Sequence, residues 1–306
     1  MTQHWKKLGR LYVPKTSGQH PKLTSHAANP LPVHLAGDTY RVFFSGRDEH
    51  NRSSVGAVDI DIVQRKVITE HFHPFFEHGP AGSFFADGVS IANCYEADGV
   101  RYMLFMGWQA PSTGHWRGDI GRLVVSPELL LTLDSDEPFM GSDSTDPISL
   151  SYPWVIKNSS GGFNMWYGST QAWDAGNGEM LHTIQHASSE RGDRWNRTGL
   201  AVPYVLGEAQ AFSRPTVVLS SSGKFCMWFS YRGNAENKYR IGFAESADGV
   251  SWSLALDKAG ISVSDTGWDS EMVEYPFVFS HKGQTYLLYN GNGYGKSGFG
   301  LAILDD

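Results

Sequence analysis

The sequence predicts an all-β protein, a five-bladed β-propeller of four-stranded antiparallel blades. Five segments of this 306-residue chain share one plan: an aromatic strand, a polar tip and a strand of small and apolar residues. With the ends of the aromatic strands aligned, the segments lie 61, 61, 62 and 61 residues apart, at Gly46, Gly107, Gly168, Ser230 and Gly291. Such steady spacing is typical of repeat architectures, in which each repeat is one unit packed on its neighbours.

Within each segment the apolar residues alternate with a period of two. Many of them are β-branched or aromatic, which favours strands over helices. A preceding strand, often introduced by Pro, is indicated at residues 29–35, 87–95, 152–158, 214–220 and 275–281. Turn formers such as AGD and EADG join it to the aromatic strand, as a hairpin requires. Three or four antiparallel strands repeated five times fit a propeller; a β-sandwich or a solenoid is the alternative.

Composition favours one domain spanning 1–306, because no linker or low-complexity tract divides the chain. Residues 1–27 are expected to close the ring as an N-terminal segment. The net charge of −7 argues against a nucleic-acid partner. No apolar run suggests a signal peptide or a membrane span, so a cytoplasmic protein without membrane contact is expected. With two cysteines, Cys94 and Cys226, in apolar strands, neither a disulfide framework nor a metal or other cofactor is predicted.

Two carboxylates are predicted to be catalytic, Asp87 and Glu274. Both stand where an innermost strand begins, and in a propeller such strands start at the central channel. A carboxyl half-buried among aromatic residues can have a pKa suited to proton transfer. For Asp87, capping the turn into the strand is the open alternative. In the third segment, Tyr152 is expected at the position that Asp87 has in the second. In the fourth segment, Arg214 is expected at the start of the innermost strand, where its buried charge would need an acidic neighbour or an anionic ligand.

Polar and aromatic residues at the neighbouring tips are predicted to bind the substrate. Arginines grip carboxylates, phosphates or sugar hydroxyls, and tryptophans offer flat faces on which a sugar ring can stack. Solvated loops and packed tryptophans remain the alternative. The predicted substrate-binding residues are Arg47, Asp48, Arg52, Trp108, Trp116, Tyr152, Trp173, Asp174, Glu208, Arg214, Arg232 and Tyr294. His182 and His186 lie on a predicted strand, not a helix, and are expected to be structural or hydrogen-bonding.

The repeating unit resembles the five-bladed propellers of glycoside hydrolases. It combines a Pro-led strand, an aromatic strand ending in FSG, FMG, WYG or YNG, and a third strand best seen in IGFAESADGVSW at 241–252. The resemblance covers about 28–304 and includes arabinanases, β-xylosidases, invertases, levansucrases and mannoside phosphorylases. It implies a carbohydrate-active enzyme that acts on a glycosidic linkage at the channel mouth, by inversion or phosphorolysis.

The chain departs from the pattern of those hydrolases, whose first three inner strands carry acidic residues. Asp87 matches the second, but Asn29 and Tyr152 stand where the base and the acid are implied. Mannoside phosphorylases need fewer carboxylates, because phosphate is the nucleophile and basic residues hold it. Such basic residues are available here: Arg47, Arg52, Arg214 and Arg232. An enzyme is favoured; the alternatives are a non-catalytic sugar-binding propeller and an intracellular glycan-biosynthesis enzyme acting on an anionic or activated sugar.

Overall fold

The fold is all-β, as predicted. The computed structural model describes residues 3–15, 17–220 and 222–305, so the ends and two single positions of the predicted 1–306 domain lie outside the described residues. Within them the chain forms 20 strands and one 3₁₀-helix, η1 (Leu256–Lys258). None of the helical structure in these ranges has the length and apolarity needed to cross a membrane.

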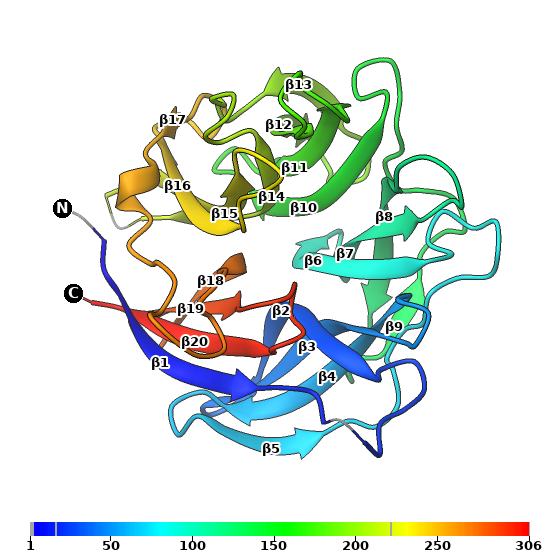
Figure 1. Ribbon diagram of the computed structural model, residues 1–306, viewed down its shortest axis with the longest axis vertical. Coiled ribbons are helices and arrows are strands. Elements are labelled where there is room, and N and C mark those ends of the chain that lie inside the picture. Colours follow the sequence, from blue (N-terminus) through cyan, green and yellow to red (C-terminus); the bar gives the residue numbers. More distant parts are fainter. Residues whose placement is uncertain (1–2, 16, 221, 306) are drawn as a thin grey trace.

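The strands form three sheets, one of four strands and two of eight (Figure 1). Each eight-stranded sheet consists of two antiparallel groups that are joined by a single parallel bridge. These bridges pair Ser53 with Gly88 and His182 with Ala211. The described chain therefore contains five groups of antiparallel strands, and neighbouring groups follow one another in the sequence.

Each group has four strands. The first is β2 (Ser25–Ala36), β3 (Thr39–Arg47), β4 (Ser53–Asp61) and β5 (Lys66–Glu70). The second is β6 (Gly88–Ala97), β7 (Val100–Gln109), β8 (Arg117–Val125) and β9 (Leu131–Leu133). The third is β10 (Ser149–Lys157), β11 (Phe163–Ala172), β12 (Leu181–Ser189) and β13 (Asn196–Leu200). The fourth is β14 (Ala211–Leu219), β15 (Phe225–Arg232), β16 (Arg240–Ser246) and β17 (Ser253–Leu254). The fifth is β18 (Glu274–His281), β19 (Gln284–Asn290), β20 (Phe299–Leu304) and β1 (Trp5–Tyr12).

The fifth group joins the two ends of the chain. β1, from the N-terminal region, pairs antiparallel with β20, so that Trp5 lies opposite Leu304 and Tyr12 opposite Phe299. Trp5 and Tyr12 are both buried, and Trp5 packs edge-on against Trp228 of β15. The N-terminal segment thus contacts the last two groups of the chain.

The first strand of each group lies at the centre of the molecule (Figure 1). These central strands are in cyclic contact: β2 with β6, β6 with β10, β10 with β14, β14 with β18, and β18 with β2. Large apolar side chains fill the space around them, among them Leu31, Phe43, Phe105, Trp166 and Phe212. Each such side chain contributes about 1.5–3 kcal/mol when it is buried.

Four of the five central strands share one irregularity, a residue with positive φ directly before a proline. These residues are Asn29 (56°), Tyr152 (37°), Arg214 (49°) and Tyr275 (52°). The register of strand pairing shifts at each of them. Left-handed backbone is strained for residues other than glycine, so the surrounding packing must hold these positions.

The fifth central strand, β6, has its register shift between Ile91 and Cys94, without a proline or a positive φ. Asp87 precedes this strand, whereas Tyr152 lies inside β10. The expectation that Asp87 and Tyr152 occupy corresponding positions is therefore wrong. The sequence comparison failed here because β6 lacks the proline that marks the shift in the other four strands.

Arg214 crosses the centre and connects the strands. Its guanidinium donates to the carbonyl oxygens of Tyr275 (2.7 Å), Pro276 (3.2 Å), Pro30 (3.0 Å) and Ala92 (3.5 Å), which belong to β18, β2 and β6. The residue is 1% exposed, and burial lowers the pKa of Arg214 to about 9. Backbone carbonyls therefore provide the hydrogen-bond partners, in place of the acidic neighbour or anionic ligand that was expected for this arginine.

Replacing Arg214 by Met should destabilise the protein strongly. The substitution leaves several buried carbonyls without a donor, and each hydrogen bond from a charged group contributes about 1.5–3 kcal/mol. We expect the free energy of unfolding in urea to fall by at least about 3 kcal/mol. The matched control is Arg194→Met, because Arg194 is exposed. Equal urea midpoints for the two variants would contradict the role of Arg214.

Candidate functional site

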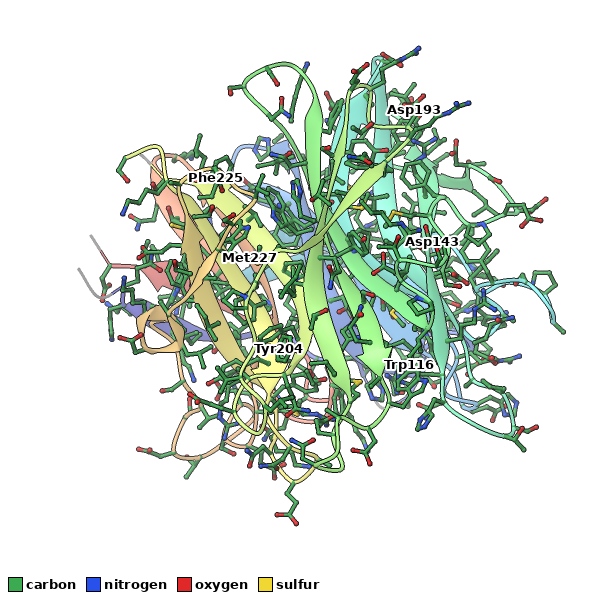
Figure 2. All side chains as sticks on the ribbon, turned by 90° about the horizontal axis from the view of Figure 1, so that it is seen from above. Trp116, Asp143, Asp193, Tyr204, Phe225 and Met227 are labelled. Atoms are coloured by element: carbon green, nitrogen blue, oxygen red, sulfur yellow. The ribbon has the colours of Figure 1, made fainter. Side chains whose placement is uncertain are left out.

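A pocket of about 400 Å³ lies at one end of the central strands. All five strand groups or their loops contribute to it. Its lining residues are Arg47, Asn51, Ser90, Met106, Trp108, Trp116, Ser151, Tyr152, Met180, His182, Phe212, Ser213, Arg232, Tyr239, Tyr275 and Tyr294. Figure 2 shows Trp116 at the lower end of the molecule, opposite the end that carries Asp193. A wider depression at that opposite end is lined by residues 188–191 and 193–196, among others.

Six of the predicted substrate-binding residues line this pocket: Arg47, Trp108, Trp116, Tyr152, Arg232 and Tyr294. Among the residues that sequence reasoning did not propose as ligand-binding are Ser90, Ser151, His182, Tyr239 and Tyr275. Ser151 and Tyr275 could have been found, because Ser151 precedes the Tyr-Pro pair of its central strand and Tyr275 belongs to the Glu-Tyr-Pro motif of another. Tyr239 has no comparable signal in the sequence.

Glu274 lies beside the pocket, next to its lining residue Tyr275, and is completely buried. Neither carboxyl oxygen has a hydrogen-bond partner in the described part of the chain. Burial raises the pKa of Glu274 well above its usual value, although the charges of Arg47 and Arg232 act to lower it. A buried carboxylate without a partner is unfavourable, so burial favours the protonated form of this group.

Two arginines on the pocket wall differ in their pairing. Arg232 forms an ion pair with the buried Glu179, at 2.7 Å between Nε and Oε2, and packs over the ring of Tyr239 at 4.9 Å. Arg47 donates to Oδ1 of Asn51 at 3.1 Å. Among the described residues no carboxylate lies within ion-pair distance of Arg47. The pocket therefore contains a guanidinium that is free to bind an anion.

Aromatic side chains form much of the remaining wall. Tyr152 and Tyr275 are in contact, with ring centroids 5.6 Å apart. Trp116 packs edge-on against Trp173 at 5.0 Å, and His115 stacks on Trp173 at 4.5 Å. Trp173, predicted to bind substrate, is not in the lining and instead supports Trp116 from behind.

The predicted residues Asp48, Arg52 and Asp174 shape loops. Asp48 accepts hydrogen bonds from the backbone N–H of His50 and of Arg52 and from Nε of Arg52. Burial acts to raise the pKa of Asp48, but the hydrogen bonds and charge of Arg52 outweigh it and lower the pKa. Asp174 accepts the N–H groups of Gly176 (2.7 Å) and Gly178 (2.9 Å), which lower its pKa. None of the three lines the pocket.

The predicted catalytic pair is not brought together at the pocket wall. Asp87 accepts the backbone N–H of Ala110, in the loop after β7, at 2.7 Å; this contact is not the cap of the turn into β6 that was the alternative. Glu208 is exposed and lines a separate depression with Gly233 and Arg240. The lining contains neither Asp nor Glu within the ranges that the structure describes.

The two histidines of β12 are hydrogen-bonded, as predicted. His182 contacts Ser151 Oγ and Thr170 Oγ1, and His186 contacts Thr198 and Asn164. Across residues 3–15, 17–220 and 222–305, no cluster of three His, Cys, Asp or Glu side chains is arranged to hold a metal ion.

Comparison with known proteins gives close relatives in one organism. The uncharacterized protein MT1551 of Mycobacterium tuberculosis strain CDC 1551 / Oshkosh is 41% identical over 304 residues, 99% of each chain. The uncharacterized protein Rv1502 of strain ATCC 25618 / H37Rv is 40% identical over 303 residues, again 99% of each chain. The chain belongs to the family of these two proteins. No family model matches it.

Solved structures of glycoside hydrolases share the fold. One of them is similar with a TM-score of 0.72 and 13% sequence identity, over 99% of this chain and 94% of that one. Its description says that the GH130 family of mannoside phosphorylases contains glycoside hydrolases that target β-1,2-mannosidic linkages. A glycosyl hydrolase of Bacteroides ovatus is similar with a TM-score of 0.70 and 12% sequence identity, over 99% of this chain and 94% of that one. An endo-arabinase of Bacteroides thetaiotaomicron is similar with a TM-score of 0.62 and 14% sequence identity, over 95% of this chain and 97% of that one. At these identities the similarity concerns the fold alone.

The buried carboxyl of Glu274 should make stability depend on pH. Its pKa is raised in the folded protein, so its contribution is complete below the unfolded pKa and is lost as the pH rises toward the folded pKa. Compared with E274Q, which does not titrate, the wild type should lose up to about 1.4 kcal/mol of unfolding free energy per pH unit in this window. Urea unfolding of both proteins between about pH 5 and pH 8 measures the difference. A difference that does not change with pH would contradict the raised pKa.

Proposed function

We propose that the five antiparallel groups are the blades of a single five-bladed propeller domain. The cyclic contacts of β2, β6, β10, β14 and β18 support this arrangement, as does the 61- to 62-residue spacing of the repeats. In this arrangement β1 completes the last blade and closes the ring, since it pairs with β20. The pocket then lies at the mouth of the central channel.

The proposed function is that of a carbohydrate-active enzyme acting on a glycosidic linkage. The observation that carries it is the carboxyl group of Glu274, buried without a hydrogen-bond partner beside the pocket. Cleavage of a glycosidic bond needs a proton on the leaving oxygen, and a carboxylic acid with a raised pKa can supply it. After that transfer, the positive charges of Arg47 and Arg232 would stabilise the carboxylate, because both act on Glu274.

The shape of the pocket supports a sugar as the substrate. Its volume of about 400 Å³ falls within the range of small-molecule sites. Trp108, Trp116 and Tyr275 provide flat apolar faces against which a sugar ring can pack, and the indole N–H of Trp108 is itself held by Ser53 Oγ at 3.1 Å. Solved structures of the same fold are described as glycoside hydrolases and mannoside phosphorylases.

Phosphorolysis is favoured over inverting hydrolysis. Inversion by water needs a second carboxylate about 6.5–9.5 Å from the acid, as general base. The described pocket lining offers no carboxylate for this task, but it presents Arg47 without an acidic partner. An anionic nucleophile such as phosphate needs no base and would be held by this arginine. A sugar-binding propeller without catalysis is the second candidate, because the same lining lacks the second carboxylate.

The variant E274Q tests the catalytic role. A panel of p-nitrophenyl glycosides is assayed with and without inorganic phosphate. We expect phosphate-dependent release of nitrophenol by the wild type. On natural disaccharides, kcat should fall by about a hundred- to ten-thousand-fold in E274Q, the usual contribution of a general acid, whereas nitrophenol release should fall much less. The aglycone needs little protonation, so natural disaccharides should show the larger loss. D87N is the matched control and should remain active, because the side chain of Asp87 accepts a hydrogen bond from the backbone N–H of Ala110 and does not line the pocket.

Two results would contradict this assignment. Full activity of E274Q on a disaccharide would remove Glu274 from the chemistry. Sugars that stabilise the wild type against heat but are never consumed would favour the non-catalytic binding protein instead.

A further inference from the structure

A buried chain of hydrogen bonds ends at the pocket wall. Ser151 Oγ lies 2.7 Å from Nε2 of His182, and Nδ1 of the same ring lies 2.8 Å from Thr170 Oγ1. The three residues are at most 2% exposed. Ser151 and His182 line the pocket, whereas Thr170 lies behind them. In the described chain, neither hydroxyl has a second hydrogen-bond partner through its side chain.

The backbone makes room for this chain at Gly168, which pairs with Ser151 across the hairpin. A Cβ at position 168 would lie 2.2 Å from Ser151 Oγ and 2.4 Å from Nε2 of His182. Any side chain there would displace one of the two polar groups. The glycine at the end of this aromatic strand is therefore required for the Ser151–His182 contact.

The need of each buried polar group for a hydrogen-bond partner determines which atoms donate and which accept along this chain of hydrogen bonds. Burial lowers the pKa of His182 to about 4, so the ring is neutral near pH 7, with one N–H and one accepting nitrogen. If Nδ1 carried the proton, the hydroxyl proton of the fully buried Thr170 would have no acceptor, which costs about 1–3 kcal/mol. If Nε2 carries it, Thr170 donates to Nδ1 and Nε2–H donates to Ser151. The proton of Ser151 is then left for the pocket.

We propose that Ser151 donates a hydrogen bond to an anionic oxygen of the sugar substrate, and that His182 and Thr170 are positioning residues that fix this direction. Only the sugar part of this proposal rests on the proposed function. The anionic class follows from the lack of acidic side chains in the described lining and from Arg47, whose five N–H donors can serve this group as well as the phosphate nucleophile. Carboxylate and phosphate groups share this chemistry.

The same direction argues against Ser151 as a nucleophile. An activated serine needs an imidazole nitrogen that accepts its proton, with a carboxylate usually orienting the second nitrogen. In the inferred tautomer Nε2–H donates to Ser151, and the group beside Nδ1 is the hydroxyl of Thr170. The Ser–His contact is therefore a recognition device rather than a catalytic dyad.

The first test measures the tautomer of His182 in the unliganded protein by two-bond ¹H–¹⁵N NMR. We expect protonation at Nε2 in the wild type and in the conservative variant T170S. In T170V the donor to Nδ1 is missing, and we expect the Nε2–H population to fall. Protonation at Nδ1 in the wild type would overturn the proposal. Covalent labelling of Ser151 by a fluorophosphonate would overturn it equally.

The second test titrates the protein with glucuronate, glucose 6-phosphate and glucose, following the His182 signals. At least one anionic sugar should bind more tightly than glucose, and the comparison of the two separates carboxylate from phosphate. The variant S151A should bind that anionic sugar about tenfold or more weakly than the wild type does, as expected for the loss of a hydrogen bond to a charged group. Equal binding of glucose, or no response to either anionic sugar, would show the anionic assignment to be wrong.

These results are independent of catalysis. An E274Q protein that keeps the tautomer and the anion preference but retains full activity would refute the proposed function and leave the role of Ser151 standing. The reverse outcome would refute this inference alone. In that outcome Glu274 is needed for turnover, but S151A binds anionic sugars as tightly as the wild type does.

Discussion

The centre of the molecule depends on one arginine that satisfies carbonyl groups from three neighbouring strands. A proline in a strand has no N–H to donate, and the residue before it is sterically restricted. The central strands contain this combination four times, with positive φ and a register shift each time. The interruption of regular pairing leaves carbonyls such as those of Pro30 and Pro276 facing the centre. Arg214, itself at one of the four positions, donates to both.

The same irregularity builds the candidate site. Two residues before each of these prolines stand Ala28, Ser151, Ser213 and Glu274, close to where the central strands open into the pocket. Ser151 and Ser213 line the pocket, and Glu274 lies buried beside its lining residue Tyr275. The feature that strains the backbone thus also places a buried carboxyl group and a hydroxyl group beside the same pocket. Backbone strain of this kind is commonly found at functional sites.

Local pattern and regular spacing were enough to predict the all-β fold and the position of most strands. They also identified six lining residues, because tips that follow aromatic strands converge wherever the strands themselves converge. The role of Asp87 was not predictable in the same way, since β6 lacks the proline used to align the other central strands. Whether its carboxylate reaches the pocket or binds Ala110 depends on the loop after β7.

Long-range contacts account for the other differences. The partners of Arg214 are backbone carbonyls up to 184 residues away in the chain, and a sequence does not show which carbonyls are left unpaired. The chain from Ser151 through His182 to Thr170 depends on the pairing of three strands in register. Trp173 and Trp116 look alike in sequence, but packing of one behind the other decides which of them can touch a ligand.

The most direct test of this account is the protonation state of Glu274, measured by ¹³C NMR of its carboxyl carbon across a pH titration, with E274Q to assign the signal. The account predicts that the carboxyl remains protonated at pH values well above its ordinary pKa of 4.5. Titration at or below 4.5 would mean that Glu274 is an ordinary carboxylate paired with the arginines. Glu274 would then have no proton to donate at neutral pH, and the proposed chemistry would fail.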